Sequence, residues 1–161
     1  TECILDSNGT NDSNKCINFT AQFGNLSLEN DGSVNVTVQL ASDVAAAAFI
    51  GGSGVPPQFK YAVVQNETMS CRNGTGGGGN VISLPITSNC TTINGVGGNC
   101  TIFPDFWANV NTTSPGTTIC QRLLYNNTDD SIGIEVNITI PFDAPAGTKT
   151  ATFTATATTI T

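Results

Sequence analysis

Hydrophobic and polar residues alternate with a period of two along much of the chain. In NVTVQL (residues 35–40) and again in EVNITI (residues 135–140), every second residue is aliphatic. Because successive side chains of a β-strand point to opposite faces of a sheet, this alternation predicts strands with one buried and one solvated face. Asn35 and Asn137 fall on the predicted solvated face, and so do Glu135 and Thr139.

Eight segments are predicted to be strands, because they are rich in Val, Ile, Thr and Phe and are bounded by turn residues. They are residues 17–28, 33–41, 59–66, 80–87, 99–104, 117–125, 131–140 and 148–160. The NDGS turn at residues 30–33 is typical of a hairpin between the first two. The pattern allows one helix, residues 42–49, which Ser42 or Asp43 would cap and Gly51 and Gly52 would end.

Short strands separated by frequent turns predict an all-β fold, specifically a Greek-key or immunoglobulin-like β-sandwich. We expect the chain to divide into an N-terminal segment, residues 1–28, and a β-sandwich head domain, residues 29–161.

The polar surface is built from uncharged side chains. Charged residues make up only 11% of the 161 residues, whereas the chain has 24 Thr, 11 Ser and 18 Asn. The net charge of −7 argues against binding to nucleic acid or to an anionic membrane surface. The longest apolar run, VAAAAFI (residues 44–50), is too short to span a bilayer, so a membrane-spanning protein is not expected.

N-glycosylation sequons are the strongest signal in the sequence. Twelve of the 18 asparagines stand in Asn-x-Ser/Thr, about three times what the Ser and Thr content would give by chance. We expect covalent N-linked glycans and no other cofactor. The predicted sites are Asn8, Asn11, Asn18, Asn25, Asn35, Asn66, Asn73, Asn89, Asn99, Asn111, Asn126 and Asn137.

An even number of cysteines without any C-x-x-C spacing predicts three disulfides and an extracellular protein whose secretory peptide has been removed. The six are Cys3, Cys16, Cys71, Cys90, Cys100 and Cys120. Proximity in the sequence suggests Cys3–Cys16 and Cys90–Cys100, which leaves Cys71–Cys120. A Cys90–Cys100 bond would close the loop NCTTINGVGGNCT (residues 89–101), with glycans at the base of the loop. Alternatively, each of these two cysteines pairs elsewhere.

Catalytic patterns are not found in the sequence. The chain has no histidine, which removes Ser-His and Cys-His dyads, so we do not expect an enzyme. No metal site is expected either, and Asp129-Asp130 is interpreted as a solvated turn. Lys60 and Lys149 are either ordinary surface lysines or partners in isopeptide links to Asn or Asp. Trp107, with Phe103 and Phe106, belongs either to the core or to a carbohydrate-binding site.

The segment INFTAQF (residues 17–23) could donate a strand to a neighbouring molecule or form the chain's own first strand. A donated strand needs one apolar face to fill pockets of its acceptor, and four side chains share such a face: Ile17, Phe19, Ala21 and Phe23. The alternative pairs this segment with residues 33–41 through the turn at residues 30–33. The C-terminal strand, residues 148–160, is a second candidate donor with smaller apolar side chains.

The dense sequons, the Thr-rich strands and the ending DAPAGTKTATFTATAT resemble secreted archaeal surface proteins, most specifically the subunit of the thread filament of Sulfolobus-type crenarchaea. The resemblance implies a glycosylated β-sandwich, similar to the head of a type I pilin, that is completed by a donor strand from a neighbouring subunit. It implies identical subunits as partners in an extracellular filament that serves adhesion or biofilm formation. The alternatives are a non-polymeric adhesin, an S-layer-associated or lectin-like binding domain, or a viral capsid or spike protein.

The small number of ion pairs that this composition allows bears on stability in acid. Most carboxylates are protonated below about pH 3, so a protein that depends on ion pairs would lose them there. This chain has few to lose, and we therefore expect its stability to change little between about pH 2 and pH 7.

Overall fold

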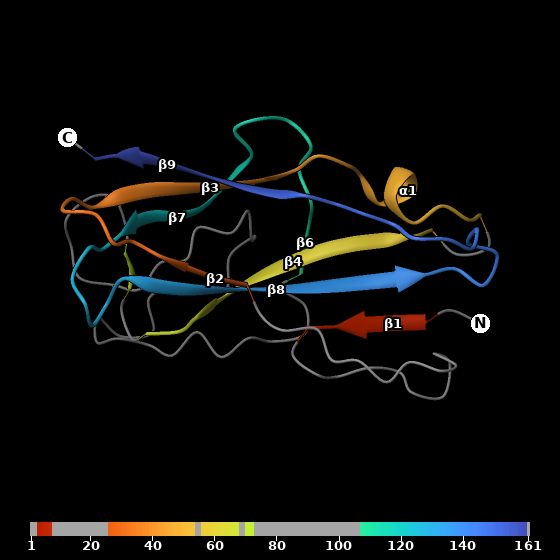
Figure 1. Cartoon of the computed structure of the whole chain (residues 1–161), viewed down its shortest axis with the longest axis horizontal. Helices are drawn as coiled ribbons and strands as arrows, with labels where there is room; N and C mark the ends of the chain where they lie inside the picture. Colours follow the sequence, from red (N-terminus) through yellow and green to blue (C-terminus); the bar gives the residue numbers. More distant parts are fainter. Residues whose placement is uncertain (1–2, 8–25, 54–55, 68–69, 73–106, 161) are drawn as a thin grey trace.

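The computed structural model describes residues 3–7, 26–53, 56–67, 70–72 and 107–160 (Figure 1). Within these residues the chain forms two antiparallel sheets and one short helix, which confirms the predicted all-β class. The sheets lie one above the other in Figure 1, with β3 and β9 in the upper part and β8 and β1 in the lower part.

The first sheet, called the β8 sheet below, is built around the long strand β8 (Ser131–Ile140). One side of β8 pairs with β4 (Gln58–Gln65) over all eight residues of β4, and β4 in turn pairs with β6 (Ala108–Asn109). The other side pairs first with β1 (Cys3–Asp6) and then with β2 (Leu26–Glu29). These two short strands therefore form one interrupted edge of the sheet.

The second sheet, called the β3 sheet below, has β3 (Val36–Ser42) as a central strand. On one side β3 pairs with β7 (Thr117–Leu123), and β7 pairs with β5 (Cys71–Arg72). On the other side it pairs with β9 (Phe153–Thr159) in an unbroken register over seven residues. β9 is therefore an edge strand of this sheet.

A single cluster of buried side chains draws on both sheets. The β3 sheet contributes Val38, Leu40, Cys71, Ile119, Cys120 and Leu123, and the β8 sheet contributes Tyr61, Val63, Ile132 and Ile134. Near this cluster, the ring of Phe59 on β4 lies 5.2 Å from that of Phe153 on β9, and 4.8 Å from that of Phe49. Burial of apolar side chains between the sheets is the main favourable term for this fold.

Four predicted strands agree with the structure to within about three residues, a normal uncertainty for strand ends. They correspond to β3, β4, β7 and β8, and for β8 both ends are as predicted. The predicted strands 80–87 and 99–104, and residues 17–25 of the first, lie outside the described residues. The last strand is shorter than predicted and begins at Phe153, while β1, β5 and β6 were not predicted.

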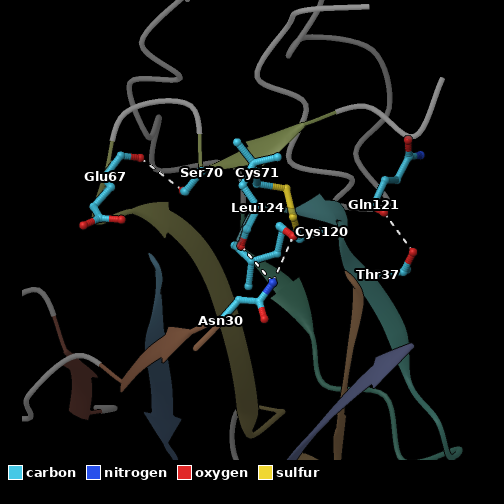
Figure 2. Close-up of a disulfide and its surroundings, with 9 residues drawn as sticks. Asn30, Thr37, Glu67, Ser70, Cys71, Cys120, Gln121 and Leu124 are labelled. Atoms are coloured by element: carbon cyan, nitrogen blue, oxygen red, sulfur yellow. Dashed lines mark hydrogen bonds between the residues drawn. A yellow bond between two sulfur atoms is a disulfide. The ribbon is translucent and has the colours of Figure 1, made fainter. Parts of the chain in front are cut away.

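The hairpin predicted at residues 30–33 is wrong. β2 pairs with β8, whereas β3 belongs to the other sheet, so the chain crosses between the sheets at this turn. The side chain of Asn30 explains the crossing. Its Nδ2 donates to the carbonyl oxygen of Leu124 (2.9 Å; Figure 2) and to that of Val34 (3.0 Å), and its Oδ1 accepts from Gly32 N. An Asx turn tied to the end of β7 thus replaces the two-residue hairpin.

The helix exists but lacks the predicted cap. α1 (Ala46–Phe49) starts after Ala45, which makes no side-chain capping bond. Asp43 instead accepts a hydrogen bond from Thr152 N through Oδ1 (2.7 Å), and Ser42 Oγ bonds to the backbone of Val44. The predicted stop is confirmed: Gly51 and Gly52 have φ angles of 76° and 93°, which side chains other than glycine rarely adopt.

The predicted solvated face of β8 is not solvated. Glu135 is 7% exposed and Thr139 is 5% exposed, while Asn137 is half-buried. β8 is therefore covered on both faces, and only its alternation, not its exposure, could be predicted from the pattern. In β3 the alternation is confirmed, because Val38 and Leu40 are buried, but Thr37 and Gln39 are half-buried rather than fully solvated.

Candidate functional site

The candidate site residues are divided between the described part of the chain and the rest. Five predicted glycosylation asparagines are described: Asn35, Asn66, Asn111, Asn126 and Asn137. The other seven lie outside the described residues: Asn8, Asn11, Asn18, Asn25, Asn73, Asn89 and Asn99. So do the donor-strand candidates Ile17, Phe19, Ala21 and Phe23 and the cysteines Cys16, Cys90 and Cys100.

Two of the described sequons form Asx turns. Asn126 Oδ1 accepts from both Thr128 N (3.1 Å) and Thr128 Oγ1 (2.9 Å), so the two polar residues of the sequon are bonded to each other. Asn111 Oδ1 accepts in the same way from Thr113 N (2.9 Å). Both turns are formed through the carbonyl oxygen, which leaves them compatible with a substituent on the amide nitrogen. Asn111 Nδ2 also donates to Thr117 Oγ1 (3.3 Å), so one of its two N–H groups is already used.

The amide nitrogen of Asn66 is fully used. It donates to Ser27 Oγ at 2.7 Å and to Ser131 Oγ at 3.1 Å, which connects the end of β4 to β2 and β8. A glycan on this nitrogen would leave one N–H, so one of the two hydrogen bonds would be lost. Glycosylation of Asn66 would therefore remove one hydrogen bond between the end of β4 and either β2 or β8.

Asn137 lies on β8 and Asn35 directly precedes β3, and both are half-buried. Asn35 Oδ1 is buried without a hydrogen-bond partner in the described part of the chain. Asn137 Nδ2 lies 3.5 Å from Asp6 Oδ2 on the adjacent strand β1. Both asparagines are therefore less accessible to a glycosylating enzyme than the exposed Asn126.

We predict that sequon occupancy follows this geometry. Asn126, exposed and in an Asx turn, should be glycosylated in a larger fraction of molecules than Asn137. Glycopeptide mass spectrometry of the native protein measures both fractions. Equal or reversed occupancy would contradict the prediction and would show that the sites are glycosylated before the chain folds.

The buried disulfide Cys71–Cys120 joins β5 to β7, as Figure 2 shows. Its Cα atoms are 5.6 Å apart, both cysteines are 0% exposed, and the bond closes a sequence separation of 49 residues. Leu124 N donates to Ser70 O beside it (3.1 Å). The predicted pairing of these two cysteines is confirmed. Cys3 is also disulfide-bonded, and its partner lies outside the described residues.

The sequence interpretation missed a pair of carboxyl groups at Glu67 and Asp130. Glu67 Oε2 accepts from Asp130 N (2.8 Å) and Ser131 N (3.0 Å), which places the two carboxyl groups beside each other. Asp130 is 3% exposed, so the predicted solvated turn at Asp129-Asp130 is wrong for this residue. No pattern in the sequence distinguishes a carboxyl pair formed across 63 residues from two surface acids.

Two buried carboxyl groups have raised pKa values. Burial is the main cause for Asp130, and the neighbouring charge and hydrogen bond of Glu67 add to it. Burial also raises the pKa of Glu135, with a further contribution from the charge of Asp6. A carboxyl group whose pKa rises on folding binds its proton more tightly in the folded state.

In place of the small change expected from the composition, we therefore predict that the free energy of unfolding rises as the pH falls from neutral. Each group stabilises the fold fully below the pKa that it has in the unfolded chain, about pH 4. This stabilisation is lost as the pH rises through the higher pKa that the group has in the folded state. Thermal melting between about pH 3 and pH 7 measures it. Asp130→Asn should flatten the profile, whereas Glu29→Gln, at an exposed carboxyl, should not. A melting temperature that drops steadily towards acid would contradict the prediction.

The outer edge of β9 is a candidate assembly surface. β9 pairs with β3 on one side, and within the described residues no strand pairs with its other side. The strand FTATATT has no charged residue, proline or glycine, and its register with β3 has no bulge. Edge strands of natural monomers usually carry one of these features, because an unprotected edge pairs with other chains. The part of the candidate donor (residues 148–160) that forms β9 is therefore already paired with a strand of its own chain, β3.

The remaining candidates are placed as follows. Trp107 is half-buried, and Phe103 and Phe106 lie outside the described residues. Lys149 is exposed, whereas Lys60 is half-buried on β4. In the described ranges, no three Asp, Glu or Cys side chains are grouped so that they could hold a metal ion. Among those residues there is also no helix with the length and hydrophobicity needed to cross a membrane.

A comparison of the chain with protein-family models, with curated proteins and with solved structures finds no match in any of the three.

Proposed function

We propose that this chain is the structural subunit of an extracellular, N-glycosylated filament that assembles head to tail by strand donation. Residues 17–23 of one subunit would add as a strand to the next subunit, and the unprotected outer edge of β9 is the acceptor that the geometry supports best. Each subunit would offer a donor and an acceptor at different places, so the contact does not close and produces a fibre.

The observation that carries this proposal is the outer edge of β9. This regular, uncharged strand of seven residues directs backbone N–H and C=O groups to an edge where no other described strand pairs with it. The exposed side chains of β9 are threonine and alanine, whose small size allows a second strand to approach closely. Backbone hydrogen bonds would supply affinity, and the apolar face of residues 17–23 would supply specificity.

Two further features support an extracellular structural role. A core cluster drawn from both sheets is what a β-sandwich head of the Greek-key or immunoglobulin-like kind requires. The sequons and the Thr- and Asn-rich surface suit a protein that presents sugar rather than charge to its surroundings. The buried disulfide suits an oxidising compartment outside the cell.

Electron microscopy of the protein purified from shed cell-surface material tests the proposal. We expect long, thin filaments of this one protein that survive SDS or heating, because all the backbone hydrogen bonds between the donated strand and β9 must break before a subunit can dissociate. Discrete monomers or a two-dimensional lattice would contradict it and would favour an adhesin or an S-layer component.

A further inference from the structure

Three polar side chains lie in a row across the β8 sheet. In the β4–β8 register Lys60 is directly opposite Asn137, and in the β1–β8 register Asp6 is directly opposite the same residue. Residues directly opposite each other on antiparallel strands have Cβ atoms about 5 Å apart and point to the same face. Asn137 is therefore between an amine on β4 and a carboxylate on β1. Figure 1 shows β4, β8 and β1 as neighbours in this order.

Glu135 is the next residue along β8 on the same face. Its cross-strand neighbour on β4 is Ala62, which is 1% exposed, so the carboxyl group of Glu135 lies on a covered part of the sheet. Glu135 Oε2 is buried and has no hydrogen-bond partner among the described residues. A buried carboxyl oxygen without a partner is costly to fold, and such groups often have a chemical role.

We propose that Lys60 and Asn137 are joined by an intramolecular isopeptide bond, whose formation is assisted by the carboxyl group of Glu135. A lysine amine, an asparagine carboxamide and a buried acid on neighbouring strands are the groups that this amide transfer needs. No cofactor, oxidant or energy source is required.

The reaction can be written with all atoms balanced. The Lys60 ammonium gives one proton to the Glu135 carboxylate, which produces a neutral amine and a protonated acid. The amine nitrogen attacks Cγ of Asn137, while the Glu135 O–H donates a hydrogen bond to Oδ1 and stabilises the negative charge that develops there. The C–Nδ2 bond then breaks, and the nitrogen leaves with protons from Nζ and Glu135. The net products are one secondary amide and one ammonium ion.

The surroundings favour two parts of this reaction, the protonated acid and the departure of the nitrogen. Burial raises the pKa of Glu135, with a smaller contribution from the charge of Asp6, so the protonated acid is stabilised in the folded state. Asn137 Nδ2 lies 3.5 Å from Asp6 Oδ2, on the strand opposite to that of Lys60. The leaving nitrogen is thus directed away from the attacking amine and towards a carboxylate that can accept its hydrogen bonds.

The bond has a consequence for the Asn137 sequon. A cross-linked Asn137 has no free carboxamide and cannot carry a glycan. The covalent link would join β4 to β8, the two longest strands of the sheet, in a position that resists their separation under tension. This inference is independent of filament assembly, because the reaction takes place within one folded chain.

Intact-mass spectrometry of the reduced, non-glycosylated chain tests the inference. We expect the folded protein to be lighter than its sequence mass by about 17 Da, the mass of ammonia. Lys60→Arg and Asn137→Ala should each have their full sequence mass, and Glu135→Gln should slow or stop the mass loss. Lys149→Arg, at an exposed lysine outside the row, should still lose ammonia.

Folding is checked separately by circular dichroism and by the presence of the Cys71–Cys120 disulfide in each variant. Tandem mass spectrometry of the tryptic digest should find one branched peptide that connects Lys60 to Asn137. A correctly folded wild-type chain at full sequence mass would overturn the inference. A native peptide that carries a sugar on Asn137 would overturn it as well.

Discussion

Replacement of Ala157 by proline should stop filament assembly and leave the subunit folded. Asp43 N donates to Thr152 O, Thr152 N donates to the side-chain Oδ1 of Asp43, and Ile160 N donates to Asn35 O. The even-numbered residues of this segment therefore direct their backbone groups towards β3. The odd-numbered residues, including Ala157, direct theirs to the outer edge. A proline there removes one outward N–H and obstructs an incoming strand, whereas the bonds to β3 remain.

Negative-stain electron microscopy measures filament length, and thermal melting measures the fold. Ala157→Val is the matched control, because it adds side-chain volume but keeps the N–H; it should still assemble. Thr156→Pro removes an N–H that points towards β3 and should lower the melting temperature instead. If Ala157→Pro forms normal filaments, the outer edge of β9 is not the acceptor.

Removal of the Cys71–Cys120 bond should cost about 4 kcal/mol of unfolding free energy, because the unfolded chain is no longer restricted by a closed loop of some 50 residues. Urea denaturation of the Cys71→Ala/Cys120→Ala variant measures this loss as a lower midpoint. Both sulfur atoms are in the buried core cluster, so the cavities left by the substitutions add to the loss.

Ser70→Ala provides a control at the neighbouring, equally buried position. It removes the hydrogen bond from Ser70 Oγ to Glu67 O and should cost only about 1 kcal/mol. If the double cysteine variant is no less stable than this control, the disulfide does not restrict the unfolded chain as proposed.

The sequence was most informative where a strand is long and regular. β8 was predicted with both ends correct because ten residues carry an unbroken alternation between turn residues. β5 and β6 have only two residues each, too few for any periodicity. The late start of β9 depends on a tertiary contact, since Asp43 binds Thr152 N just before the strand begins. Local propensity carries no information on that contact.

Strand partners and exposure were harder to predict. The NDGS turn has the composition of a hairpin, but the bond from Asn30 to Leu124 O, 94 residues away, directs β3 into the other sheet. The burial of Glu135 and Asp130 has the same origin, because both depend on residues distant in the sequence. The Cys71–Cys120 pair was predicted only as the remainder after the cysteines closest in sequence were paired, because the sequence alone does not determine how six cysteines are connected.

A reconstruction of the native filament by electron cryo-microscopy, with residues 17–23 traced, tests strand donation most directly. We predict that Ile17, Phe19, Ala21 and Phe23 of one subunit lie in a strand hydrogen-bonded to the sheet of the next subunit, along the outer edge of β9. A trace in which residues 17–23 pair only within their own subunit would contradict strand donation by this segment.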